Sequence, residues 1–398
     1  MSESFKNDSS KIIGGEFAIA PDVLAGALNV VGSYNTEIIK DSDNDNVFYF
    51  SSGRAALYAV LSSEQKDSPL HISVPDYLCS SVIDTITDLG SNYSFYHIED
   101  NLYPDNNSLF YVLSNVKEKT KKVLLLINYF GLLNLDTVTT LVRDRYPEVI
   151  IICDDVQNYY GFGKEKDYDY AFTSIRKWFP VPDGGILKLS KNVRNTADSL
   201  TGVSNYPVKS AEQREAGIIQ ILETMKAPDQ FVSYKLAGNI LKSYRQVISD
   251  KVCLELIAKG EELLDQNYKC QISDISLRLL KSYIVGEQDI AASIRKNNAE
   301  YLHIGLNRLG IDHIYESDKI PLFVPMFVDP SKRDAIRNKM FDNNIFCPVH
   351  WKKNTLAKEI NNSSKIYDME LSLICDQRYD QKDMNKILEI LKNECGNN

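Results

Sequence analysis

Short apolar segments separated by helix-patterned stretches fill the first half of the chain. Residues 47–50 (VFYF), 71–74 (HISV) and 93–99 (YSFYHIE) read as strands, and residues 79–90 (CSSVIDTITDLG) have the spacing of a helix. Two nearly continuous apolar runs, 122–131 (KVLLLINYFG) and 148–157 (EVIIICDDVQ), are typical of strands covered on both faces. A helical stretch, 135–146, lies between them. This alternation predicts an α/β fold with a mainly parallel sheet flanked by helices.

The second half of the chain has a different pattern. Residues from about 210 to 280 are mostly helical, and an α+β unit follows with helices at 289–310, 331–344 and 381–393 and a strand at 322–328. We therefore predict a large domain over residues 1–285 and a smaller C-terminal α+β domain over residues 286–398. Whether residues 1–20 pack on the small domain is left open.

Composition excludes several classes of protein. The 398 residues carry a net charge of −9, which argues against a broad basic surface for nucleic acid. No apolar run of membrane-spanning length and no secretory signal is present, so we expect a cytoplasmic protein with no membrane partner. Seven scattered cysteines and five dispersed histidines show no metal-ligand spacing, so we expect no metal.

Three segments fall where an open α/β sheet binds ligands, outside the carboxyl ends of its strands. SSGRA (51–55) is a strand-to-helix turn whose free backbone N–H groups suit a phosphate, and Ser52 can cap the helix. CDDVQ (153–157) places carboxylates at the end of an apolar strand. TSIRKWFPVPDGG (173–185) crowds Lys177 between a second cation and bulky apolar residues, an environment that lowers the pKa of an amine.

These segments, in this order, resemble the fold-type-I pyridoxal-phosphate enzymes and, more narrowly, the DegT/StrS family of sugar aminotransferases. FSSGRAAL is similar to the family's phosphate turn, VPDYLCSSV to its Val-Pro-x-Tyr-Thr segment, and DYAFTSIRKWFPVPDGGIL to its lysine segment. PEVIIICDDVQNYYG and LSLICDQRYDQKDMNKIL resemble two further family stretches. The resemblance covers most of the chain and implies a seven-stranded sheet in the large domain.

The resemblance also implies roles for individual residues around pyridoxal 5'-phosphate. Lys177 would form the internal imine and then carry the proton between the substrate and the cofactor. Asp154 would pair with the pyridine nitrogen, and Gln157 would bind the phenolic oxygen. The phosphate would be held by Ser174 and by the turn at Ser52, Gly53 and Arg54.

The chain departs from the family pattern at several positions. Arg54 replaces the usual threonine, so it either contacts the phosphate directly or points to an acidic neighbour. Cys79 stands where many members carry a ring-stacking aromatic residue; either Tyr77 or this thiol faces the ring, or both only pack. Asn205 is a weak candidate for the phosphate-binding asparagine of the partner subunit.

Two more segments are candidates for substrate binding. His350, Trp351 and Lys352 either bind a nucleotide diphosphate or sugar, or form a surface loop. Arg378 either holds the carboxylate of the amino donor or forms a surface ion pair.

The resemblance implies a homodimeric aminotransferase that moves an amino group, from glutamate, to a nucleotide-linked keto-deoxysugar for glycan or secondary-metabolite synthesis. Retention of Lys177 argues against the family's dehydratase branch, in which histidine replaces it. Two alternatives remain: another fold-type-I activity, such as an amino-acid transaminase or lyase, and a regulatory or partner protein without turnover.

Overall fold

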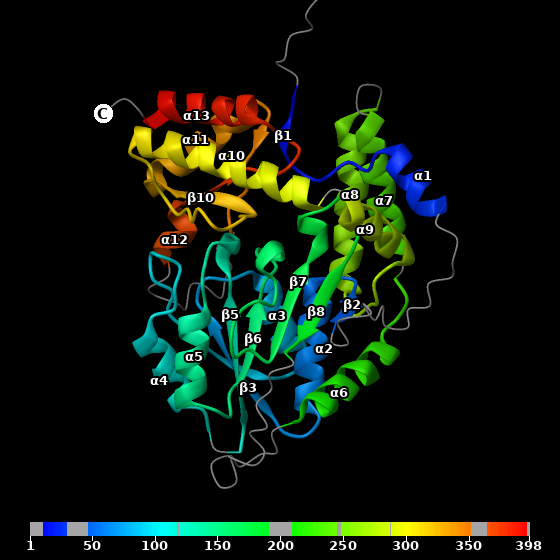
Figure 1. Ribbon diagram of the computed structural model, residues 1–398, viewed down its shortest axis with the longest axis vertical. Coiled ribbons are helices and arrows are strands. Elements are labelled where there is room, and N and C mark those ends of the chain that lie inside the picture. The colour runs from blue at the N-terminus through cyan, green and yellow to red at the C-terminus, as the bar shows by residue number, and fades with distance from the viewer. Residues whose placement is uncertain are drawn as a thin grey trace, which may run out of the picture.

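A seven-stranded sheet forms the centre of the larger part of the protein (Figure 1). The computed structural model describes residues 11–29, 47–117, 119–190, 209–228, 230–244, 248–286, 288–351 and 364–395. The strands are β2 (Val47–Phe50), β3 (Leu70–Pro75), β4 (Asn92–Tyr96), β5 (Lys121–Ile127), β6 (Ile150–Asp154), β7 (Tyr170–Ser174) and β8 (Gly185–Leu189), in the order β2-β8-β7-β6-β5-β3-β4. Strand β8 runs opposite to the other six strands of this sheet, which confirms the predicted α/β class with a mainly parallel sheet.

The helices of this part cover the sheet because the central strands are apolar on both faces. Every residue of β6 is buried, and Leu124 of β5 pairs in register with Ile151 of β6. The covering helices are α2 (Gly53–Gln65), α3 (Ser80–Asp88), α4 (Asn106–Ser114), α5 (Asp136–Arg145) and α6 (Ala211–Thr224). Helix α2 packs across β2, β8, β7 and β3.

A helical layer lies beside the sheet (Figure 1) and consists of α1 (Pro21–Asn29), α7 (Gln230–Leu241), α8 (Asp250–Gln266) and α9 (Asp274–Gly286). Its core includes Ala27 of α1 and Leu279 of α9 together with Trp178 and Phe179. The apolar residues that follow Lys177 in the sequence are therefore anchors that fix the lysine segment against this layer.

A second sheet and its helices lie above the large sheet in Figure 1. Its strands are β9 (Asp312–His313), β10 (Phe323–Phe327) and β12 (Glu370–Ile374), in the antiparallel order β12-β10-β9. The helices are α10 (Gln288–Leu309), α11 (Pro330–Asp342), α12 (Ser364–Met369) and α13 (Gln381–Cys395). Near the amino terminus, β1 (Ile13–Gly14) pairs in parallel with β11 (Ile345–Phe346), and Ile13 belongs to this second core. The domain division at residue 286 stays a prediction.

Among the described helices, none combines the length and apolar character needed to cross a membrane.

Backbone packs directly on backbone where β8 meets the start of α2. A Cβ atom added to Gly185 would lie 2.2 Å from the carbonyl carbon and oxygen of Ser52. The amide of Gly184 donates a hydrogen bond to the carbonyl of Ser51 at 2.7 Å. Glycine at position 185 is therefore what allows the turn before α2 to sit against the segment that carries Lys177.

We predict that Gly185→Ala destabilises the protein by about 1–3 kcal/mol, because the methyl group can be accommodated only by moving backbone. Gly26→Ala is the matched control, since a Cβ there meets nothing within 4 Å and alanine favours the helix α1. Denaturant unfolding of both variants checks this. Equal stability of the two variants would show that the close approach is not a constraint.

Candidate active site

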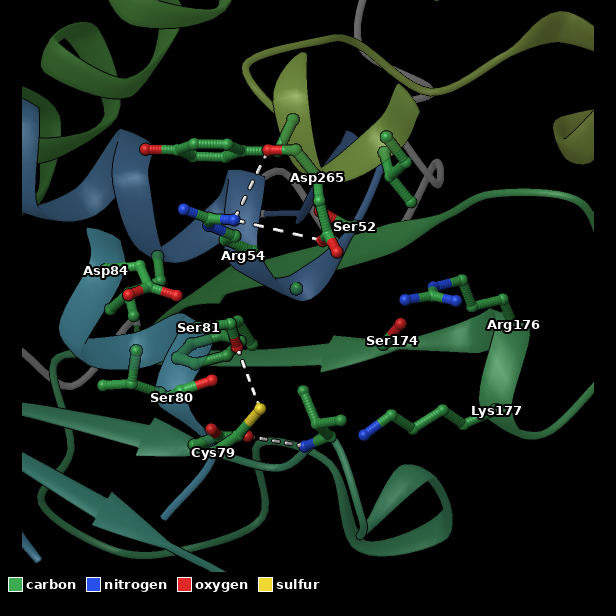
Figure 2. A pocket seen from close by; sticks show the side chains of 18 of the residues that line it. Ser52, Arg54, Cys79, Ser80, Ser81, Asp84, Ser174, Arg176, Lys177 and Asp265 are labelled. Atoms are coloured by element: carbon green, nitrogen blue, oxygen red, sulfur yellow. Dashed lines mark hydrogen bonds and ion pairs between the residues drawn. The ribbon is translucent and has the colours of Figure 1, made fainter. Parts of the chain in front are cut away.

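A cavity of about 400 Å³ opens at the carboxyl ends of β6 and β7, next to the first turn of α2 (Figure 2). In an open α/β sheet this is the expected place for a ligand. The cavity is lined by the start of α2, by the end of β6 and by the turn that carries Lys177, and residues of α8 close one side. Its lining includes Ser52, Gly53, Arg54, Cys79, Ser81, Asp84, Asp154, Gln157, Ser174, Arg176, Lys177, Glu261, Asp265, Tyr268 and Trp351.

The two neighbouring carboxylates at the end of β6 face different surroundings. Asp155 is completely buried away from the cavity and accepts hydrogen bonds from the Asn158 side chain and the Gly163 amide, both at 2.9 Å. Asp154 lines the cavity and accepts one hydrogen bond, from the Val156 amide at 3.0 Å. Burial raises the pKa of Asp154 to about 6, while the charge of Lys177 opposes this rise. A cationic group of a ligand would therefore find an acceptor in Asp154.

Lys177 ends a one-turn 3₁₀ helix, Ile175–Lys177, directly after β7. Trp178 fixes this turn, because it is fully buried and its indole N–H donates to the Val156 carbonyl at 3.1 Å. Loss of contact with water lowers the pKa of the Lys177 amine, and the charge of Arg176 lowers it further. A lowered pKa leaves more of the amine unprotonated and able to act as a nucleophile or base.

Gln157 has one unsatisfied group in the cavity wall. Its side chain is 2% exposed, and its Oε1 accepts a hydrogen bond from the Phe130 amide at 2.8 Å. Its Nε2 is buried and has no hydrogen-bond partner among the described residues. Leaving such a donor unpaired costs about 1–3 kcal/mol, so an acceptor atom of a ligand would be favoured here.

The first turn of α2 forms the third wall of the site. Ser52 caps the helix, and its side chain accepts a hydrogen bond from the Ala55 amide at 3.1 Å. Ser174, at the end of β7, lines the same part of the cavity, and its hydroxyl donates to the Gly184 carbonyl at 3.4 Å. A helix start with free amides and a hydroxyl beside it is suited to an anion such as phosphate.

Arg54 follows the second of its two predicted alternatives. It lines the cavity, but its guanidinium stacks on the Tyr268 ring at 3.9 Å and donates to the Thr85 hydroxyl at 3.2 Å. Two carboxylates lie close to it, Asp88 at 3.7 Å and Asp265 at 3.9 Å. The side chain thus points to its acidic neighbours.

Tyr77 and Cys79 lie in different surroundings: only Cys79 lines the cavity. Cys79 lines the cavity and accepts a hydrogen bond from the Ser81 hydroxyl at 3.2 Å. Tyr77 is not part of the lining: it is fully buried, and its ring lies 4.8 Å from Tyr367 and 5.1 Å from Trp351. Tyr77 therefore packs within an aromatic cluster rather than facing the cavity, which corrects the expectation that it stacks on a ligand.

His350 and Trp351 lie beside the cavity and are not a surface loop. Trp351 lines it, and the His350 ring accepts or donates a hydrogen bond with the Ser372 hydroxyl at 2.7 Å. The His350 amide donates to the carboxylate of Glu370 at 2.6 Å. Burial and the charge of Lys177 lower the pKa of His350 to about 3, so its ring is neutral at physiological pH.

One described residue among the predictions, Arg378, lies outside the cavity lining. Arg378 is paired with Asp376 at 2.7 Å, and it donates to the Gly15 and Glu16 carbonyls, so it ties the amino-terminal segment to the second core. Arg378 thus follows the second of its two predicted alternatives, an ion pair. Asn205 and Lys352 lie outside the described residues.

Arg176 and Glu261 are among the cavity residues that the sequence did not identify. Arg176 was a neighbour of Lys177 without an assigned role, and Glu261 lies on α8, which showed only a helical pattern. The two side chains form an ion pair across 85 positions of the sequence. No local signal predicts such a contact.

Comparison with known proteins identifies the fold of this chain but no sequence family. No family model and no curated protein matches this chain. Among solved structures, Spr1654 from Streptococcus pneumoniae in its PLP form aligns with a TM-score of 0.69 at 16% identity, covering 97% of this chain and 99% of that one. The aminotransferase PseC of Helicobacter pylori, involved in pseudoaminic acid biosynthesis, aligns with a TM-score of 0.68 at 12% identity, covering 97% and 100%.

A third structure, the sugar aminotransferase CalS13 from Micromonospora echinospora, aligns with a TM-score of 0.66 at 13% identity, covering 95% of this chain and 98% of that one. This chain has the fold of these aminotransferases. The fold that the motifs implied is thereby confirmed over nearly the whole length.

Glu370, the buried partner of His350, gives the site a pH-dependent contribution to stability. Burial raises the pKa of this carboxyl group from 4.5 to about 8. Between these values the folded protein binds more protons than the unfolded chain, so the contribution of Glu370 weakens as the pH rises through this window.

We predict that Glu370→Gln flattens this part of the pH dependence, because glutamine is neutral at every pH. Its amide oxygen can accept from the His350 amide, and its NH2 group can donate to the Ser372 hydroxyl, which in the wild type donates to Glu370. The difference in melting temperature, wild type minus variant, should fall by several °C between about pH 5 and pH 9. Melting curves across that range check it. A constant difference between the two proteins would mean that Glu370 does not titrate in this window.

Proposed function

We propose that this protein is a pyridoxal-phosphate-dependent aminotransferase that acts on a sugar. One observation carries the proposal: a single cavity holds a lysine of lowered pKa, a carboxylate, a buried amide without a partner among the described residues, and a helix start suited to an anion. Each of these matches one functional group of pyridoxal phosphate. The shared fold with PseC and CalS13 supports the same activity.

The residues present fit the cofactor. Asp154 is the acceptor suited to its protonated pyridine nitrogen, and a cation there would keep the carboxylate ionised. The unpaired Nε2 of Gln157 is the donor suited to its phenolic oxygen. Ser174 and the first turn of α2 are suited to its phosphate, and Cys79 is the candidate for contact with the ring. The group itself supplies an electron sink for the carbanion that amino transfer requires.

Lys177 has two tasks in this proposal. Its Nζ would hold the cofactor covalently and, once released by the amino donor, would move the proton at the substrate carbon. Both tasks require an unprotonated amine near neutral pH, which burial and the neighbouring Arg176 favour. The turn that carries Lys177 is fixed by buried Trp178, so the amine is pre-positioned in the cavity.

The substrates and the assembly are proposed on the family resemblance. The amino donor is glutamate and the acceptor is a nucleotide-linked keto-deoxysugar destined for glycan or secondary-metabolite synthesis. Trp351 and, next to it, the neutral His350 are the residues of this chain that we assign to contact with the sugar. The enzyme is proposed to work as a homodimer in the cytoplasm.

We predict that the purified protein shows the visible absorption of lysine-bound pyridoxal phosphate, and that glutamate converts it to the pyridoxamine form. Lys177→Ala should remove the visible band, because no other described lysine lines the cavity. Lys166→Ala is the control, since this lysine is exposed and pairs only weakly with Asp136 at 3.8 Å. An unchanged spectrum in Lys177→Ala would defeat the proposal.

The acceptor is tested by supplying glutamate with keto-sugar nucleotides or with simple keto acids and measuring amino transfer. We expect turnover with at least one keto-sugar nucleotide and little with keto acids. Turnover of keto acids alone would replace the sugar assignment by an amino-acid transaminase. Cofactor binding without any transfer would favour the non-catalytic alternative.

A further inference from the structure

We propose that Arg176 binds the phosphate of the cofactor and that Glu261, supported by Lys235, holds its guanidinium at the cavity wall. This inference rests on the proposed function and deepens it, because it assigns the cationic ligand of the phosphate. Arg176 stands between Ser174 and Lys177, so one short turn would supply both the phosphate contact and the covalent attachment.

The position of Arg176 supports this role. Its side chain lines the cavity, and Figure 2 shows its guanidinium extending over Ser174 toward the middle of the cavity. Asp84, by contrast, lies on the opposite side of that view. One guanidinium nitrogen is paired with Glu261, while Nε is buried and has no hydrogen-bond partner among the described residues. The guanidinium therefore has donor capacity left for a ligand.

The ion pairs around Arg176 contain more cations than carboxylates. Glu261 forms ion pairs with both Arg176 and Lys235, and these two cations lower the pKa of Glu261 to about 2. Although Glu16 and Asp265 add negative charge nearby, the one ion-paired carboxylate, Glu261, can neutralise only one of these two positive charges. Lys235 is 1% exposed and cannot reach a ligand itself, so Arg176 is the member of the cluster that presents this charge to the cavity.

Glu16 and Asp265 also lie near Arg176, and their negative charges stabilise its cationic form. Asp265 is shared with Arg54, at 3.9 Å.

A second feature of the cavity points to a ligand independently of Arg176. The Gln157 amide is almost completely buried in the wall and lacks a partner for its Nε2. A molecule that satisfies Gln157 and carries a phosphate would be bound at both ends.

Arg54 provides a matched comparison within the same cavity. Both arginines carry one charge and both line the cavity, but Arg54 is committed to the Tyr268 ring, the Thr85 hydroxyl and its acidic neighbours. If proximity alone decided phosphate binding, the two would contribute equally. If uncommitted donor capacity decides it, Arg176 contributes more.

The test compares the affinity of the cofactor-free protein for pyridoxal phosphate and for pyridoxal, which lacks the phosphate, by spectroscopic titration. Arg176→Gln should weaken the affinity for pyridoxal phosphate by about 10- to 100-fold more than the affinity for pyridoxal, because only pyridoxal phosphate loses a charge-assisted hydrogen bond. The effect of the lost charge on the pKa of Lys177 acts on both compounds alike. Arg54→Gln should cause a smaller phosphate-specific loss of affinity than Arg176→Gln, because the guanidinium of Arg54 is already bound to other partners. Arg176→Lys keeps the cation and the Glu261 pair, so it should fold normally and show a smaller, still phosphate-specific loss.

The outcomes separate this inference from the proposed function. Equal losses for both compounds, no loss in either Arg176 variant, or a larger phosphate-specific loss in Arg54→Gln would overturn the role of Arg176 while leaving the enzyme class intact. If the wild type bound neither compound, the proposed function would fail and the inference with it.

Discussion

The close packing of the turn at Ser51–Gly53 on the segment Gly184–Gly185 is the contact on which the site depends. It joins the end of β2 and the start of α2 to β8, the strand next to β7. The Ile175 amide donates to the Gly184 carbonyl at 3.1 Å, so the lysine turn is tied to the same place. Asp183, just before, is completely buried and accepts a hydrogen bond from the Ser273 amide at 2.9 Å. The helix start and the lysine are thus held together by backbone rather than by mobile side chains.

Most charged groups in the cavity are already committed to partners. Arg54 is committed to a ring and to two carboxylates, and Glu261 to two cations. Among the described residues, the groups that retain capacity include the Lys177 amine, the Asp154 carboxylate, the Gln157 amide and part of the Arg176 guanidinium. Because an unpaired polar group in a cavity costs free energy, these groups define the chemistry of the ligand the cavity favours.

The fold and part of the site could be predicted because their signals are local. The apolar runs of β5 and β6 identify covered parallel strands, and residues that end such strands, as Asp154 does, meet at one edge of the sheet. The antiparallel direction of β8 could not be predicted, since an apolar pattern carries no direction. The ion pair of Arg176 with Glu261 depends on how α8 packs, and that is decided by tertiary contacts between distant segments.

The most direct test of the account is to locate the lysine that pyridoxal phosphate modifies. The protein is incubated with the cofactor, reduced with borohydride and digested, and the peptides are analysed by mass spectrometry. We expect a single reduced cofactor group on Lys177, because this amine lines the cavity and has a lowered pKa. Modification of another lysine in preference to Lys177, or no stable modification, would contradict it.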